Sequence, residues 1–374
     1  MIATTRSVVS VSEPTLYVAF ELSKNEWKLA MTSGFGVTPW LRTVASGDWR
    51  TLERVVAEGR RRLGLPADGV TVSCYEAGRD GFWIHRALVA RGWRNRVVDS
   101  ASLEVNRRAR RTKTDRIDAL KLVAMLVRRC CGEPRVWSEV HVPTVDAEAT
   151  RHVSRERAAL VGEQTRVVNQ MRSWLATYGS VLPRRGAAGW WRTVRDWAGT
   201  SLPDAVQQRL ARAAARLALV RAQMAELDTQ QQTAVRTAGA ETGLGRLVQL
   251  KGVAVTGASV LIDEGLVWRA FRNRRQVGGL LGFAPTPYDS GETHRDQGIG
   301  RGNRRLQSIG VQLAWQWVRW QPDSPLTQWY RTRFGRGKRA RRIGIVALAR
   351  KLVIALWRYA TTGVAPAGAI RRAA

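Results

Sequence analysis

The sequence contains few cysteines and histidines, and this scarcity argues against several kinds of site. Only three cysteines and four histidines occur among 374 residues. The cysteine count is odd, and neither residue type shows the spacing of metal ligands. We therefore expect reduced, structural thiols rather than a disulfide framework. A zinc enzyme is disfavoured for the same reason.

Long hydrophobic runs are also absent. No apolar stretch is long enough to cross a bilayer, and the N-terminus lacks the pattern of a signal peptide. We therefore expect a soluble, cytoplasmic protein with no membrane partner. Apolar residues still make up 44% of the chain, so hydrophobic cores can form. The length suits two domains joined by a helical connector.

Acidic residues are scarce relative to basic ones. The chain has 61 lysines and arginines against 30 aspartates and glutamates, which gives a net charge of +31. Such a charge predicts a polyanionic partner, most simply nucleic acid. Most of the basic residues are arginines, which favour forked contacts to phosphates and stacking on bases. An arginine-rich genome could account for part of this bias, but it does not change the sign of the charge.

The first third of the chain predicts a mixed sheet with helices. Residues 15–23 are largely apolar, which is typical of a central strand. Asp48 is a candidate N-cap for a helix that ends near Arg62. Further strands are expected at 27–32, 41–45, 70–76 and 96–99, with helices from about 82 to 88 and from 115 onward. This order predicts an α/β domain.

Two aspartates, Asp115 and Asp118, stand in the first turn of the last of these helices. Residues three apart share a helix face, so the two carboxylates project together. A divalent cation held by their oxygens would relieve the repulsion between them. The alternative is a solvated helix start, where acids suit the helix dipole. The segment before them is basic and is a candidate nucleic-acid contact through Arg110, Arg111 and Lys113.

Two glutamates stand on predicted strands of the same domain. Glu21 lies on the first strand and Glu76 ends the fourth. A mixed sheet of this order places adjacent strand ends beside the helix that begins at Asp115. Glu21, Glu76, Asp115 and Asp118 could then converge on one point, and four carboxylates cannot all stay ionised there without cations. Such a set suits two Mg²⁺ ions that assist phosphoryl transfer.

The middle of the chain predicts two long amphipathic helices. They span about 142–176 and 204–236, with a tryptophan- and glycine-bearing linker at 186–200. A break between two such helices predicts an antiparallel hairpin or a coiled coil. Packing within one chain and a dimerisation arm are both compatible with this pattern.

The last third carries a glycine-rich segment and most of the excess charge. Residues 250–258 resemble a helix-hairpin-helix turn, with Ala254 where a second glycine is usual and a helix expected at 255–261. Ser290 is expected on an exposed glycine-rich loop. From Val267 onward the chain has 21 basic and four acidic residues, a local charge of +17. The densest basic residues are candidate nucleic-acid contacts: Arg336, Lys338, Arg339, Arg341 and Arg342.

Two further features of this region carry expectations about packing. Trp315, Trp317, Trp320 and Trp329 precede the basic run, and we favour a core or helix-packing role for them over base stacking. The segment after Gly363 is expected to be loose.

Three spaced motifs identify a family. The segments 18–24, 75–83 and 113–119 resemble, in order, the transposases of IS110-type insertion sequences. The resemblance implies a RuvC-like domain of ribonuclease-H fold with an Asp-Glu-Asp-Asp set. Glu76, Asp115 and Asp118 match its last three members, and Glu21 stands where the family usually has aspartate.

The resemblance extends to the C-terminal third and covers nearly the whole chain. There the family carries a nucleophilic serine in a Ser-Gly motif after a Gly-Leu-x-Pro segment. Residues 282–285 followed by Ser290 and Gly291 match this pattern, and residues 301–303 form a second matching segment. We expect Arg301, Asn303 and Arg304 to contact nucleic acid. A hydroxyl needs a base or metal to become a nucleophile. The carboxylate site would therefore have to approach Ser290, either within one chain or from another subunit.

The resemblance therefore implies a DNA transposase that acts through metal-assisted serine attack on phosphate. It also implies a homo-oligomer, a dimer or tetramer, and in part of the family an element-encoded guide RNA. We expect a RuvC-like domain at 1–140, a helical connector at 141–240 and a transposase domain at 241–374. The alternatives are a junction endonuclease that uses water and a non-enzymatic nucleic-acid-binding protein.

Overall fold

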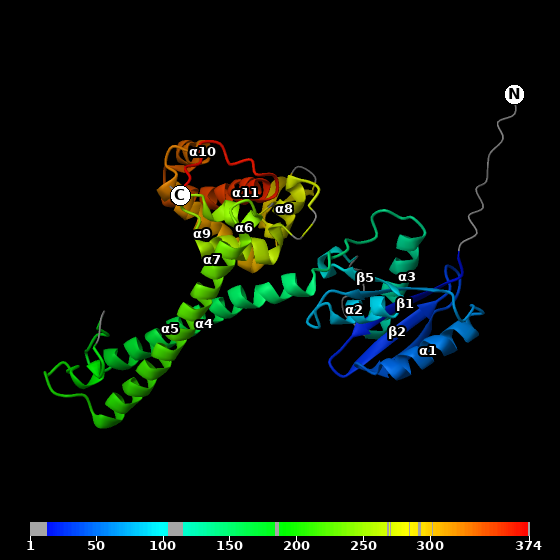
Figure 1. Cartoon of the computed structure of the whole chain (residues 1–374), viewed down its shortest axis with the longest axis horizontal. Helices are drawn as coiled ribbons and strands as arrows, with labels where there is room; N and C mark the ends of the chain where they lie inside the picture. The colour runs from blue at the N-terminus through cyan, green and yellow to red at the C-terminus, as the bar shows by residue number, and fades with distance from the viewer. Residues whose placement is uncertain are drawn as a thin grey trace. The chain divides into compact units, whose positions relative to one another are not determined.

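The computed structural model describes the chain except for residues 1–12, 104–114, 184–186, 268, 270, 284, 291–292, 301 and 373–374. Side chains are outside the description at 101, 285–290 and 293–299 as well. The chain divides into two compact units, Met1–Val142 and Pro143–Ala374 (Figure 1). Each unit is considered by itself.

The first unit is built on one mixed sheet. Its strands are β1 (Thr15–Leu22), β2 (Glu26–Thr32), β3 (Trp40–Ala45), β4 (Val70–Glu76) and β5 (Arg94–Val98), in the spatial order β3-β2-β1-β4-β5. β2 runs antiparallel to β1 and β3, whereas β4 runs parallel to β1 and β5. The apolar strand β1 is central, as its composition predicts. The predicted α/β domain with a mixed sheet is confirmed.

Helices cover both faces of this sheet. The helices are α1 (Trp49–Arg62), α2 (Trp83–Ala90) and α3 (Asp115–Cys130), with a 3₁₀ turn η1 (Ser100–Ser102). At the start of α1 the Asp48 carboxylate accepts a hydrogen bond from the Thr51 amide at 3.0 Å, so the predicted cap is confirmed. One core joins α1 and α2 to strand residues such as Val18 and Phe20. A second core joins α3 to the opposite face, where Ala19 lies.

The second unit begins with a long helical hairpin. Helices α4 (Val145–Ala176) and α5 (Asp204–Ala238) pack against each other, and a 3₁₀ turn η3 (Trp190–Arg192) lies in the connection (Figure 1). Leucines, valines and Met171 at helical spacing form the seam between them. The predicted hairpin is confirmed as packing within one chain, and oligomer formation stays a prediction.

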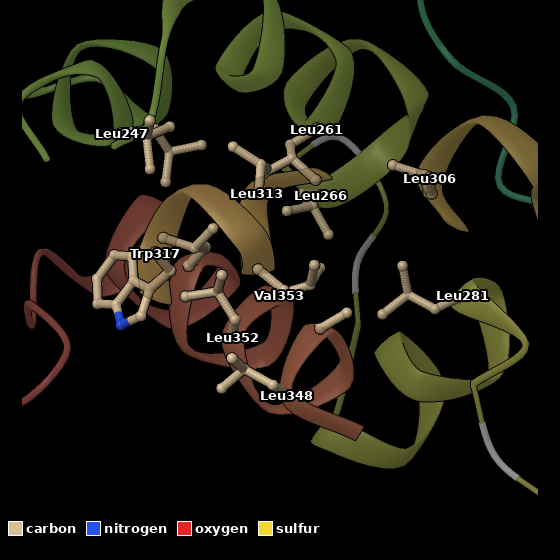
Figure 2. Packing of buried hydrophobic residues seen from close by; sticks show 14 of the residues in the cluster. Leu247, Leu261, Leu266, Leu281, Leu306, Leu313, Trp317, Leu348, Leu352 and Val353 are labelled. Atoms are coloured by element: carbon tan, nitrogen blue, oxygen red, sulfur yellow. The ribbon is translucent and has the colours of Figure 1, made fainter. Parts of the chain in front are cut away.

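A mainly helical body completes the second unit. It contains α6 (Gly243–Val248), α7 (Val255–Leu261), the π-helix η4 (Ile262–Leu266), α8 (Arg274–Leu281), α9 (Arg304–Trp320), α10 (Pro325–Phe334) and α11 (Lys338–Thr362). Helices α9 and α11 meet at its centre, where Leu313 and Trp317 face Leu352 and Val353 (Figure 2). Helix α7 covers 255–261, as predicted.

A β-hairpin replaces the loop expected around Ser290. Strands β6 (Pro285–Ser290) and β7 (Thr293–Ile299) pair antiparallel, and Ser290 pairs with Thr293 at the tip. The expectation of a loop was wrong because two prolines and several glycines hide the strand pattern. A two-stranded ribbon has only edge strands, and edge strands tolerate proline.

The segment after Gly363 is anchored, so the expectation of a loose tail was also wrong. Leu250 and Arg371 form an isolated antiparallel bridge, and the Lys251 amide donates to the Ile370 carbonyl at 3.0 Å. The buried Gln321 side chain donates to the Lys251 and Ile370 carbonyls and accepts from the Ile370 amide. These partners lie far apart in sequence, so local composition could not reveal them.

Two expectations from the residue scarcities can be compared with the structure. All three cysteines are free thiols, and Cys74 is buried. Within the described ranges, no helix combines the length and apolar character needed to cross a bilayer.

Candidate functional site

The sheet presents two glutamates on the face that α3 covers. Side chains alternate between the faces of a strand. On β1, Ala19 lies in the α3-side core, so Glu21 projects to the same side two residues later. On β4, Cys74 lies in that core, so Glu76 does likewise. The parallel register pairs Phe20 with Tyr75, and therefore Glu21 and Glu76 stand level at the carboxyl ends of adjacent strands.

Helix α3 begins beside this strand end. Asp115 precedes the buried Ala119 by four residues, so it lies on the stripe of α3 that faces the sheet. The partly exposed Asp118 has the same relation to the buried Leu122. The predicted α3 start thus places both aspartates on the side of the sheet that carries Glu21 and Glu76.

Lys28 links the two elements. It is the register partner of Glu21 across β1 and β2, and its ammonium donates to the Asp115 carboxylate at 3.0 Å. The hydrogen bond to Asp115 raises the pKa of Lys28 above its ordinary value. A second carboxylate, that of Glu26, lies 3.7 Å from the same ammonium. The sequence motifs gave no indication of this cation.

The four carboxylates suit a hard divalent ion in the type of ligand that they offer. Four carboxylates, Glu21, Glu76, Asp115 and Asp118, share one face and one end of the sheet, and oxygen ligands are those that Mg²⁺ prefers. Their side chains are not drawn together into a site: among the described residues, no group of three or more His, Cys, Asp or Glu is placed to hold a metal ion. The basic residues Arg110, Arg111 and Lys113 lie outside the described residues.

The Ser290 hairpin is closed at its base by a backbone crossing. Gly282 has φ +64°, and a Cβ there would lie 2.5 Å from the Gly302 amide nitrogen. A side chain on Gly302 would in turn meet the backbone of Leu281 and Gly282. The Asn303 amide donates to the Leu280 carbonyl at 2.9 Å. The two strands therefore leave the helical body through a contact that only glycines permit.

Asn303 has a structural part in this anchor. Its side-chain oxygen accepts from the Arg305 and Leu306 amides and caps α9, while its amide nitrogen donates to Glu264 at 3.1 Å. Its role as a nucleic-acid contact stays a prediction, and its side-chain oxygen and nitrogen already have these partners. Of its neighbours in the motif, Arg301 lies outside the described residues and Arg304 is exposed at the start of α9.

Glu264 is the centre of a buried ionic cluster. The carboxylate is only 2% exposed and makes a forked pair with Arg155 of α4 at 3.0 and 3.1 Å. The Arg305 guanidinium lies 3.3 Å away. Burial alone would raise the pKa of Glu264, but Arg155, Asn303 and Arg305 together hold it below its ordinary value. The cluster joins α4, η4 and the start of α9, and the sequence motifs did not indicate it.

Asp263, next to this cluster, carries a testable pH dependence. Burial, with a smaller effect from Glu264, raises its pKa from 3.8 to about 7. Between these values the folded state binds the proton more tightly than the unfolded state, so the free energy of unfolding falls as pH rises through this window. We expect Asp263→Asn to flatten this fall and to stabilise the protein above pH 7, by at most about 4 kcal/mol.

Urea denaturation at pH 5 and pH 8 measures the effect of Asp263→Asn. Asp323→Asn is the control, because Asp323 is an exposed acid on a connection. Equal changes in the unfolding free energy at both pH values would show that Asp263 titrates normally.

The basic run before and within α11 is exposed. Arg336, Lys338, Arg339, Arg341 and Arg342 all have exposed side chains. In the part of the chain that the structure describes, no acidic side chain pairs with any of the five. The positive end of the α11 dipole adds to their charge. This surface is thus open to solvent, and its contact with nucleic acid stays a prediction.

Comparison with known proteins identifies the family of this chain. The model of the family described as "Transposase IS116/IS110/IS902 family" matches residues 245–328, which include the Ser290 hairpin and α9. The chain is 36% identical over 384 residues to "Putative transposase y4rJ" of Sinorhizobium fredii, covering 98% of this chain and 97% of that protein.

Two further relatives are more distant. "Putative transposase y4qE" of Sinorhizobium fredii is 27% identical over 318 residues, which cover 77% of this chain and 74% of the relative. "Transposase for insertion sequence element IS1328" of Yersinia enterocolitica is 27% identical over 224 residues, 59% of this chain and 65% of the relative. Because the chain is 36% identical to the y4rJ protein over nearly its whole length, and because the family model matches as well, the chain belongs to the IS116/IS110/IS902 family of transposases.

Proposed function

We propose that this transposase cuts and rejoins DNA by metal-assisted attack of Ser290 on a phosphate. The observation that carries the proposal is that Glu21 and Glu76 end adjacent strands on the sheet face that α3 covers, while Asp115 and Asp118 stand in the first turn of α3. The strand order, with β2 antiparallel at the side of β1, supports a ribonuclease-H-like domain. The four carboxylates would hold Mg²⁺, most simply two ions, which supplies charge stabilisation for phosphoryl transfer.

The chemistry assigned to Ser290 balances without a further reactant. Its hydroxyl oxygen forms a bond to phosphorus, and the bond from phosphorus to one strand oxygen breaks. The hydroxyl proton passes, by way of a carboxylate or water, to the departing strand oxygen, which becomes a free hydroxyl end. The product is a phosphoserine link that a second strand end can attack to restore a DNA bond. Because Ser290 and the acids belong to different units, the reaction requires the two units, of one chain or of two, to meet in the functional complex.

Partners follow from the same proposal. DNA of the element ends and of the target is the substrate, and the family resemblance extends this to an element-encoded guide RNA. A homo-oligomer, dimer or tetramer, would let one subunit's acids serve another's serine. The net charge of +31 supports a polyanionic partner, and the α4–α5 hairpin offers a long surface for assembly.

The proposal is tested with purified protein, Mg²⁺ and DNA that carries the insertion sequence and its target. We expect new strand junctions together with a protein-linked DNA end on a denaturing gel. Nicks without a linked end would support an endonuclease that uses water. Binding without any cleavage would support a non-enzymatic nucleic-acid-binding protein.

The basic run predicts strongly salt-dependent binding. Each phosphate contact releases counterions, so the logarithm of the affinity falls with the logarithm of salt concentration by about 0.9 per contact. Replacing Arg336, Lys338, Arg339, Arg341 and Arg342 by glutamine should reduce this slope by roughly 3 to 5. Fluorescence anisotropy with labelled DNA at several salt concentrations measures the slope.

The control for this prediction neutralises five exposed arginines of the α4–α5 hairpin instead. Suitable positions are Arg166, Arg172, Arg209, Arg212 and Arg216. An unchanged slope in the α11 variant would place the phosphate contacts on another surface.

A further inference from the structure

Two adjoining cavities form a groove along α9. The larger one, of about 950 Å³, lies between α9 and the turn that contains Lys251 and Gly252. The smaller one, of about 390 Å³, continues toward the start of α9 and α4. Both are lined by Arg157, Thr256 and Gln312, so they are continuous. We refer to this surface as the α9 groove.

One stripe of α9 forms the floor of the groove. Residues four apart share a helix face, and five of the lining residues of α9 follow this spacing. At 1.5 Å per residue the stripe is about 24 Å long. It offers hydroxyl, amide, cationic and aromatic groups, from Arg304, Ser308, Gln312, Gln316 and Trp320. The aliphatic side chains of Ile309 and Leu313 line the cavities beside it.

Of the four tryptophans expected to pack in the core or between helices, Trp317 and Trp329 lie in or against the core and Trp315 packs edge-on against Tyr330, but Trp315 and Trp320 also line the larger cavity. Trp315 is 46% exposed and Trp320 is 41% exposed, whereas Trp317 between them is fully buried and supports the core. The helix therefore turns two aromatic rings outward in a body that has a well-packed interior. Exposed indoles beside polar groups are typical of surfaces that bind a planar partner.

Cations accompany these rings. The Lys251 ammonium lies 5.9 Å from the Trp320 ring centre and the Arg319 guanidinium 5.1 Å from it. The anchored tail brings Arg372 to the same cavity, and Arg304 lies at the other end of the groove. Among the described residues that line the two cavities, none is acidic. The groove thus combines positive charge with aromatic faces.

We propose that the α9 groove binds an unpaired nucleic-acid strand, with bases stacked on Trp315 and Trp320 and phosphates near Lys251, Arg304 and Arg372. In a duplex the base faces are stacked on each other, so only unpaired bases can use the indoles. At about 3.4 Å per stacked base, the stripe accommodates up to roughly seven nucleotides. The inference rests on the proposed function, since strand exchange exposes unpaired strands.

Unpaired DNA and unpaired RNA share this chemistry, and the test separates them. Labelled 12-nucleotide strands of one sequence, as DNA, as RNA and as duplex DNA, are titrated with the full-length protein at roughly 0.3 M salt, where non-specific binding is weak. The variants are Trp315→Ala with Trp320→Ala, and the control Trp197→Ala. Trp197 is 83% exposed and lies outside the groove.

The double variant is expected to bind single strands at least about tenfold more weakly, because stacking on each ring contributes strongly to affinity. Duplex binding and the Trp197→Ala protein should change less than about twofold. The larger loss on DNA or on RNA identifies the natural strand. An equal loss on duplex and single strand, or no loss on either single strand, would overturn the inference.

A second pair of variants keeps the test independent of folding. Gln312→Glu places a negative charge in the groove at an exposed position, and Gln232→Glu makes the same change on exposed α5. Only Gln312→Glu should weaken single-strand binding. These readouts need no recombination, so groove-dependent binding by a protein that joins no DNA would contradict the proposed function alone. If the protein recombines DNA, but neither the tryptophan double variant nor Gln312→Glu weakens its single-strand binding, only the proposal for the groove is contradicted.

Discussion

Ser290→Ala is expected to abolish strand joining and the covalent protein–DNA adduct while leaving nucleic-acid binding near normal. The substitution removes the proposed nucleophile and nothing else, because alanine lacks only the hydroxyl oxygen. Ser290 ends β6 at the tip of a two-stranded hairpin, away from the backbone crossing at Gly282 and Gly302. A change of this size should alter stability by only about 0.5 kcal/mol.

The assay uses DNA that carries its own cleavage site and detects a protein-linked strand end on a denaturing gel. Ser201→Ala, at an exposed serine before α5, is the matched control and should retain both joining and adduct. Ser290→Cys should keep a trace of activity, since a thiolate is also a nucleophile. Full recombination by the Ser290→Ala protein would remove the phosphoserine mechanism and favour attack by water.

Asp118→Asn is expected to eliminate Mg²⁺-dependent cleavage, a loss as large as that for Ser290→Ala. The amide keeps the shape of the side chain but removes a ligand charge, which weakens a hard-cation site severely. Asp118 is partly exposed, so the fold should survive the change. Glu21→Asp, which restores the residue usual in the family, should retain activity because the carboxylate remains.

Two measurements check this prediction. Titration calorimetry with Mg²⁺ or Mn²⁺ alone reports binding without activity, and cleavage assays report the reaction. Glu58→Gln is the control, because Glu58 is a partly exposed carboxylate on α1, and this helix packs on the opposite face of the sheet. Cleavage by the wild-type protein at its full rate in excess chelator would show that the four carboxylates serve another purpose.

The first unit follows closely from local sequence patterns. The apolar run of β1, the Asp48 cap and the acids of α3 each define an element within a residue or two of its observed end. Strand alternation even orients Glu21 and Glu76 once the sheet order is known. The side-chain contacts do not follow from local patterns in the same way, because the ion pair between Lys28 and Asp115 depends on β2 lying beside α3.

The second unit exceeds what local patterns can predict. The β6–β7 pairing is hidden by prolines, and the docking of residues 370–372 onto 249–251 joins segments more than a hundred residues apart. Tryptophan positions show the same limit. Helical spacing alone does not tell which of Trp315, Trp317 and Trp320 faces the core, since that depends on where α11 packs.

Because of the glycine crossing at its base, the Ser290 hairpin can change in evolution independently of the helical body. The chain segments that lead into and out of the hairpin meet at Gly282 and Gly302, and the Asn303 amide donates a hydrogen bond to the Leu280 carbonyl. Residues between these points can therefore be exchanged, lengthened or shortened without disturbing the helical core. Mobile elements that diversify should keep Ser290, Gly291 and small residues at both ends of that interchangeable cassette, and they should vary most at the other positions within 286–299.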